Sequence, residues 1–268
     1  MQEIFIKSFD GTRLFFNKQT IEEPKGAVVF VHGLCEHQGR YDWVAEQFRS
    51  AGYSTYRFDH RGHGRSEGVT AHYNDYNELL DDTNFIVDLA IEENPGLPVF
   101  VYGHSMGGFA VALWGAKYPN KPIAGIICNG GLTEDAAGFL DAVPDGLDPL
   151  TELPNELGDG VCSVDEVRDW YGKDPNNRHH FTCGLVYAIR NGIAWFTTRK
   201  KDFAYPVLLT HGEKDGIISP KDTIDMFNEI SSEDKQMKIY GKLCHEVHNE
   251  YCREEVISDY INWMNHRA

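Results

Sequence analysis

A chain of 268 residues is long enough for one large α/β domain with an insertion, and its length does not require two domains. A hydrophobic content of 41%, with 12% aromatic residues, excludes an extensively disordered chain. The formal net charge of −16 argues against nucleic acid as a partner and against docking on an anionic membrane.

Signals for export, membrane insertion and metal binding are weak. Residues 1–5 contain no basic segment followed by an apolar core, so we predict no secretory signal. No stretch approaches the ~18 apolar residues of a membrane span. The six cysteines are scattered without a Cys-x-x-Cys pair, which is typical of reduced thiols, and we expect a cytoplasmic protein. Because His245 and His248 lack the spacing of a zinc-binding His-Glu-x-x-His motif, we expect no metal, and we expect no cofactor.

The first expected strands are residues 3–9 and 12–17, in which apolar and polar side chains alternate. Asp10-Gly11 joins them and is typical of a β-hairpin turn. From residue 26 the pattern changes to strand–helix repeats. The expected strands are 26–31, 53–58, 98–102, 123–128, 206–210 and 236–240, and the expected helices include 41–51, 76–93, 220–230 and 249–266. This alternation predicts an α/β fold: a mostly parallel, eight-stranded sheet with helices on both faces and antiparallel strands at one edge.

The alternation breaks between residues 130 and 202. This segment is rich in proline and glycine, contains short helical patterns and shows no convincing strand. It is too long for an ordinary loop, so we interpret 130–202 as a mainly helical lid and 1–129 with 203–268 as the core. Its position after the sixth strand places it over the carboxyl ends of the sheet. From residue 134 to 174 it contains twelve Asp or Glu against one Arg and one Lys.

The pentapeptide Gly103-His104-Ser105-Met106-Gly107 lies between an expected buried strand and an expected helix of small residues. A Gly-x-Ser-x-Gly in this setting is typical of a nucleophile elbow, which holds the serine hydroxyl out at the sheet edge. The glycines are needed because side chains there would clash with neighbouring backbone. We therefore predict that Ser105 is a nucleophile rather than a surface serine in a glycine turn.

Serine needs a general base, and the base needs an orienting acid. In the elbow fold the chain order is Ser, acid, His. Asp215 follows the expected strand 206–210 and is the preferred acid, with Glu213 and Asp222 as weaker alternatives. His245 and His248 both follow the last strand; His245 is nearer to it and is the preferred base.

An oxyanion hole needs two backbone N–H donors. Met106, directly after the nucleophile, is one expected donor. Leu34 is the other, because it follows His32-Gly33 in the loop after the expected strand 26–31. The loop 59–66 has glycine-forced turns, and we interpret it as mainly structural.

The chain resembles the α/β-hydrolase superfamily, and more narrowly the monoacylglycerol lipase and lysophospholipase group of serine hydrolases. The resemblance runs from about residue 11 to residue 263. It rests on the segments 32–41, 59–68, 103–108 and 245–250, and on the style of the lid. It implies Ser105, Asp215 and His245 as a catalytic triad with Leu34 and Met106 as oxyanion donors. It also implies that Glu36, Arg40 and His248 line the polar end of the pocket, where the glycerol of a monoacylglycerol would bind.

These observations predict a cofactor-free serine hydrolase that cleaves carboxylic esters through an acyl-enzyme. The expected substrates are monoacylglycerols, lysophospholipid-type esters or short-to-medium-chain esters, presented as small molecules or micellar lipid, because an acidic lid disfavours anionic lipid surfaces. A general carboxylesterase, a thioesterase or an acyl peptidase remains an alternative, since the same triad serves any acyl transfer. A non-catalytic scaffold that binds a small molecule is the alternative of another class.

Overall fold

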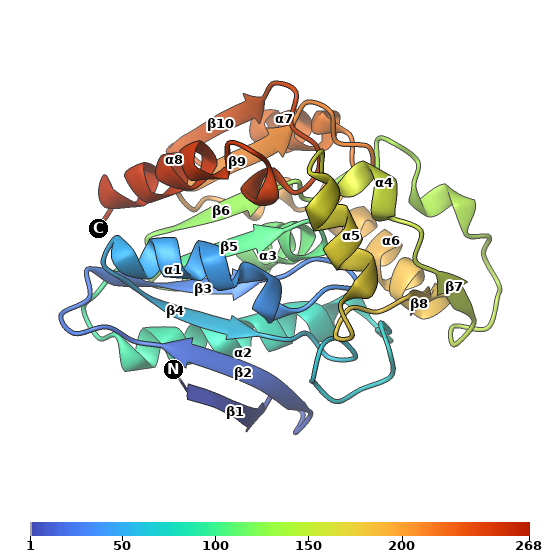
Figure 1. Cartoon of the computed structure of the whole chain (residues 1–268), viewed down its shortest axis with the longest axis horizontal. Coiled ribbons are helices and arrows are strands. Elements are labelled where there is room, and N and C mark those ends of the chain that lie inside the picture. Colours follow the sequence, from blue (N-terminus) through green and yellow to red (C-terminus); the bar gives the residue numbers. More distant parts are fainter. Residues whose placement is uncertain (1) are drawn as a thin grey trace.

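The computed structural model describes residues 2–268, except for the side chains of Gln2 and Asp159. Met1, the first residue of the expected core range 1–129, lies outside the described residues. One eight-stranded sheet crosses the molecule and is covered by helices on both faces (Figure 1). The predicted fold class, a mostly parallel sheet of eight strands, is confirmed.

The strand order in the sheet is β1-β2-β4-β3-β5-β6-β9-β10. Its members are β1 (Gln2–Lys7), β2 (Arg13–Gln19), β3 (Gly26–Val31), β4 (Tyr53–Phe58), β5 (Val99–His104), β6 (Gly125–Asn129), β9 (Val207–Gly212) and β10 (Lys235–Tyr240). β1 and β2 form the predicted hairpin, and β2 joins β4 in antiparallel orientation. All other neighbours are parallel, so their carboxyl ends meet at one edge of the sheet.

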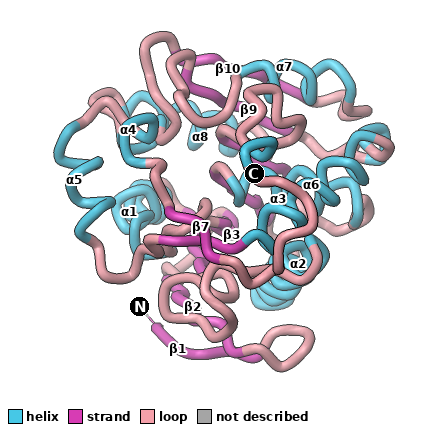
Figure 2. Tube along the Cα trace, turned by 90° about the vertical axis from the view of Figure 1, so that its right-hand side faces the viewer, coloured by secondary structure: helices cyan, strands magenta, loops and turns pink. Residues whose placement is uncertain are grey.

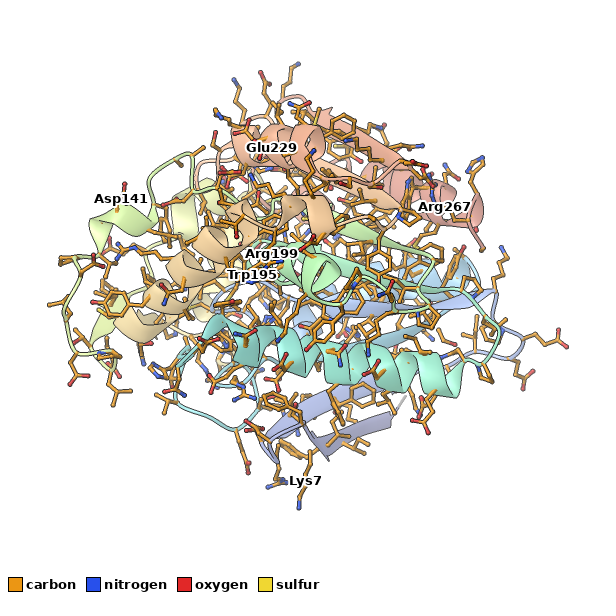
Figure 3. The ribbon with its side chains drawn as sticks, turned by 180° about the vertical axis from the view of Figure 1, so that it is seen from behind. Lys7, Asp141, Trp195, Arg199, Glu229 and Arg267 are labelled. Atoms are coloured by element: carbon orange, nitrogen blue, oxygen red, sulfur yellow. The ribbon has the colours of Figure 1, made fainter. Side chains whose placement is uncertain are left out.

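Two apolar layers fix the helices to the sheet. On one face lie α1 (Asp42–Ser50) and α8 (Arg253–Asn265), which pack through a cluster containing Phe48 and Trp263. On the other lie α2 (Tyr76–Glu93), α3 (Met106–Lys117) and α7 (Pro220–Glu229), together with α6 (Cys183–Thr197). Figure 3 shows this second face, where Trp195 of α6 lies above α2; its ring is 6.0 Å from that of Tyr76.

The segment between β6 and β9 lies at the edge where the parallel strands end (Figure 1). It contains η2 (Leu140–Ala142), β7 (Glu152–Pro154), α4 (Gly158–Val161), α5 (Asp165–Lys173), β8 (His180–Thr182), α6 and η3 (Lys200–Asp202). Viewed onto this edge, α4 and α5 lie to one side, α6 to the other, and β7 between them (Figure 2). The expectation of no strand here is wrong: β7 and β8 pair antiparallel. At three residues each, they are too short to show an alternating pattern.

The remaining differences from the sequence prediction are small. Expected and observed bounds agree for β3, β4 and α2, and differ by a few residues elsewhere. The last helix begins at Arg253 rather than at residue 249, because the chain first forms a short turn, η4 (Val247–Asn249). Within residues 2–268 no helix is both long and apolar enough to cross a membrane.

Candidate active site

Ser105 lies in a tight turn between β5 and α3. Its backbone has φ +57° and ψ −119°, a conformation that costs a non-glycine residue free energy and is found mainly at functional sites. A Cβ on Gly103 would overlap the carbonyl oxygen of Gly107, and a Cβ on Gly107 would overlap the carbonyl oxygen of Val31. Both glycines of the motif are therefore required by close backbone packing.

His245 and Asp215 lie side by side at the ends of the last two strands. The Nδ1 atom of His245 is 2.6 Å from Oδ2 of Asp215. The other carboxylate oxygen, Oδ1, accepts hydrogen bonds from the backbone N–H groups of Ile217 and Ile218, both at 2.9 Å. Nε2 of His211 also lies 2.9 Å from Oδ2. The side chain of Asp215 is fully buried, so this geometry is held without competition from water.

The electrostatics favour an ionised acid beside a basic imidazole. Burial alone would raise the pKa of Asp215, but the neighbouring imidazoles of His245 and His211 hold that pKa far below its usual range. Burial alone would lower the pKa of His245, but the Asp215 carboxylate outweighs it and the pKa of His245 is raised. The pair can therefore accept a proton on the imidazole while the carboxylate stays charged.

A small cavity joins Ser105 to His245. Its wall also contains Leu34, Glu36 and Glu246. The structure thus brings the predicted nucleophile, the predicted base and one predicted oxyanion donor to the same cavity. Leu34 follows β3 and Met106 begins α3, and within residues 2–268 neither backbone N–H has a protein acceptor.

A second, apolar cavity of about 430 Å³ begins at Ser105 and Met106. Most of its wall comes from the β6–β9 segment, through Leu132, Phe139, Leu140, Phe181, Leu185 and Ile189. The arrangement offers an apolar compartment and a more polar one that both reach the same serine.

The residues expected at the polar end of the pocket do not share one environment. Glu36 lines the small cavity, but Arg40 and His248 line neither cavity. His248 is fully buried, its ring stacks on Tyr41 at 5.2 Å, and its Nδ1 is 3.2 Å from the hydroxyl of Tyr102. Burial lowers the pKa of His248 to about 4, so its imidazole is neutral at pH 7.

The two alternative acids serve other purposes. Glu213 is half exposed and accepts a hydrogen bond from the backbone of Lys242 at 3.1 Å. Asp222 is buried and accepts four backbone hydrogen bonds from residues 133–136, which tie the start of the β6–β9 segment to α7. Among the described residues neither carboxylate contacts His245.

Two residues near the site, His211 and Glu250, were not predicted from the sequence. His211 lies four residues before Asp215 on β9, and this spacing was an available signal. Glu250 accepts from the backbone N–H of Cys244 and of Ser163, both at 2.9 Å, and so joins the loop of the base to the β6–β9 segment. Nothing in the local pattern marks Glu250, because its partner Ser163 is 87 residues away. Within residues 2–268 no group of three or more His, Cys, Asp or Glu side chains has a metal-binding arrangement.

Comparison with known proteins identifies relatives along nearly the whole chain. Residues 22–251 match the family "serine aminopeptidase, S33". A monoacylglycerol lipase from Mycolicibacterium smegmatis is 34% identical over 261 residues, covering 95% of this chain and 93% of the relative. A phospholipase from Bacillus subtilis is 28% identical, covering 88% and 93%. The crystal structure of a monoacylglycerol lipase from Paleococcus ferrophilus superposes with a TM-score of 0.82 at 26% identity, covering 95% and 99%.

Proposed function

Because the chain belongs to the serine aminopeptidase S33 family, we propose that it hydrolyses monoacylglycerols through an acyl-enzyme formed on Ser105. The chain has the α/β-hydrolase fold and is a carboxylic ester hydrolase. The proposal adds the identity of the nucleophile, its partners and the preferred alcohol.

In the proposed mechanism, Ser105 attacks the ester carbonyl while His245 takes its proton. Asp215 keeps the imidazole in the required tautomer, and its contact at 2.6 Å supports this role. The N–H groups of Leu34 and Met106 stabilise the oxyanion. His245 returns the proton to the leaving alcohol and then activates the water that hydrolyses the acyl-enzyme.

The observation that carries the substrate assignment is the division of space around Ser105. The apolar cavity, whose wall is made mainly of leucine, isoleucine and phenylalanine side chains, suits an acyl chain. The small cavity, with carboxylates in its wall, suits a small neutral alcohol. A monoacylglycerol has these two parts, joined by one ester bond.

Charge favours glycerol over a phosphate-containing headgroup. The small cavity is lined by the carboxylates of Glu36 and Glu246, and the cation between them, Arg40, is paired with both. A phosphodiester would approach two carboxylates without gaining a partner, and like charges in a low-dielectric site repel strongly. We therefore infer that lysophospholipids are poor substrates.

We further propose that residues 130–202 act as a lid on a core formed by 1–129 and 203–268. Support comes from the cavity wall, which is built largely from this segment. The acidic charge of the segment supports presentation of the substrate as monomers or neutral micelles rather than on anionic bilayers.

The test compares three esters with the same acyl chain: a monoacylglycerol, the methyl ester and lysophosphatidylglycerol, whose phosphodiester carries a negative charge and no cation. We expect the highest kcat/KM for the monoacylglycerol, the lowest for the lysophospholipid, and no turnover by Ser105→Ala. A fluorophosphonate probe should label the wild-type protein and fail to label Ser105→Ala. Equal rates for the lysophospholipid and the monoacylglycerol would refute the substrate assignment, and full activity of Ser105→Ala would refute the mechanism.

A further inference from the structure

A buried ionic cluster joins the two loops on either side of Ser105. Nη1 of Arg40 is 2.6 Å from a carboxylate oxygen of Glu36 and 2.6 Å from one of Glu246, while Nη2 is 2.8 Å from the other oxygen of Glu246. No more than 3% of any of these side chains is exposed. We call these three residues the Arg40 cluster. Buried charges are tolerated only with good geometry, so the cluster holds its members at fixed positions.

Glu36 connects the cluster to the loop of Leu34. Its Oε1 atom accepts hydrogen bonds from the backbone N–H of Gly33 at 2.5 Å and from the hydroxyl of Tyr41 at 2.6 Å. The next residue after Leu34, Cys35, has a φ of +58°, which a non-glycine residue adopts only when its surroundings hold it there. A Cβ on Gly33 would lie 3.1 Å from that of Ser105, so this loop passes directly beside the nucleophile.

Glu246 connects the cluster to the base, because it follows His245 in the chain. Its backbone N–H donates to the carbonyl of Val161 in α4 at 2.8 Å, and its carboxylate accepts from the side chain of Asn249 at 2.7 Å. The guanidinium of Arg40 lies under the rings of Trp170 and Tyr171 of α5, at 5.3 Å and 4.8 Å from their centroids. The cluster is therefore held by the oxyanion loop, the base loop and α5 together.

We propose that Glu36, Arg40 and Glu246 are positioning residues for ester hydrolysis, which fix the Leu34 N–H and His245 relative to Ser105. This inference rests on the proposed function. Arg40 lines neither cavity, and its guanidinium is already engaged by two carboxylates. A fixed donor needs no reorganisation when negative charge develops on the substrate, and this is where such a cluster contributes to rate.

The cluster also carries a net charge of −1 beside the base. The groups that face His245 are the carboxylates of Asp215, Glu246 and Glu36, the ring of His104 at 4.6 Å and the neutral ring of His248. Burial, with help from neighbouring cations, keeps the pKa of His104 well below its usual value, so that ring is neutral. Removing one negative charge from this set should make His245 harder to protonate.

The experiment compares Glu36→Ala with Glu36→Gln on a monoacylglycerol and on the methyl ester of the same acid. The Ala variant loses the acceptor for the Gly33 N–H, whereas Gln retains one oxygen. We expect Ala to lower kcat by about 100-fold on both esters with little change in KM, and Gln to recover about tenfold of that loss. In both variants the acid limb of kcat/KM should move to lower pH.

The result that would overturn the inference is a raised KM for the monoacylglycerol with an unchanged methyl ester, because the methyl ester would then be hydrolysed at full rate without the Glu36 acceptor. An unchanged kcat and acid limb, with only a lower Tm, would reduce the cluster to a structural role. If the Ala variant does not fold, the Gln variant still tests the shift of the acid limb, and Arg40→Lys, which keeps the charge, tests the loss of kcat. As a control, Asp82→Asn breaks another buried ion pair, with Arg61 at 2.7 Å, and should lower Tm without changing kcat.

The proposed function is tested separately on the wild-type protein. Failure of the fluorophosphonate to label Ser105 would refute the proposed function. Labelled, active wild-type protein with a fully active Glu36→Ala would refute the positioning role alone.

Discussion

Replacing Asp215 with asparagine tests the proposed acid–base pair atom by atom. Asparagine has one oxygen and one NH₂ group where aspartate has two oxygens. The backbone N–H groups of Ile217 and Ile218 both donate to Oδ1 at 2.9 Å, so the asparagine oxygen should take that position. The NH₂ group must then face Nδ1 of His245, which is 2.6 Å from Oδ2 in the native protein.

That arrangement forces His245 into the wrong tautomer. With an NH₂ group opposite, Nδ1 must accept a hydrogen bond, so the ring proton moves to Nε2 and the atom that should receive the proton of Ser105 is blocked. The equivalent change in another serine hydrolase lowers kcat by about 10⁴-fold, which corresponds to about 5.4 kcal/mol of lost transition-state stabilisation. We expect a loss of this order here. KM should change little, because Asp215 lines neither cavity.

The assay is steady-state hydrolysis of a p-nitrophenyl ester, with circular dichroism to show that the variant is folded. Glu213→Gln is the matched control, because Glu213 lies two residues earlier, is one of the two alternative acids and is half exposed. It should retain full activity. More than a tenth of wild-type kcat in a folded Asp215→Asn protein would refute the reasoning, and so would a comparable loss in Glu213→Gln.

Three further predictions concern pH, the apolar cavity and acid stability. Since Asp215 raises the pKa of His245, and only the neutral imidazole can act as base, kcat/KM should fall as pH drops through a midpoint above about 6.5; a lower midpoint would contradict this. Ile189→Phe fills part of the apolar cavity, so kcat/KM for a long-chain p-nitrophenyl ester should fall about tenfold or more relative to the acetate, whereas equal effects on both would argue against an acyl pocket. Burial lowers the pKa of His60 to about 3 and of His63 to about 4. On acidification these two imidazoles therefore take up protons in the unfolded chain at a higher pH than in the folded protein. The free energy of unfolding should therefore fall below pH ~6.5, and denaturant titrations at pH 7 and pH 5 would reveal it; equal values would count against this account.

Much of the core is predictable because its signals are local. The run 53–58 is bounded by turn residues and forms β4 with the same limits, and the amphipathic stretch 76–93 forms α2. The elbow is also a local signal, because its five residues are consecutive, although the Val31 carbonyl oxygen that requires Gly107 belongs to a neighbouring strand. Sequence order was then enough to propose Asp215 and His245 as partners of Ser105.

What the sequence could not supply depends on distant partners. Arg40 and His248 stand in the expected loops, but a loop does not reveal which way its side chains face. Arg40 is buried because Glu246, 206 residues away, pairs with it. The strands β7 and β8 likewise form by pairing with each other, and neither has an alternating apolar–polar pattern of its own.

The carboxylates around His245 have opposing effects on the reaction. They stabilise the imidazolium that forms when Ser105 loses its proton, but they also stabilise a resting imidazolium that cannot act as base. Arg40 offsets one of these negative charges, so Arg40→Gln should raise the pKa of His245 and move the acid limb of kcat/KM to higher pH, opposite in sign to Glu36→Gln. Parallel pH profiles of both variants would measure this. If both limbs moved in the same direction, charge would not be what the Arg40 cluster contributes to the base.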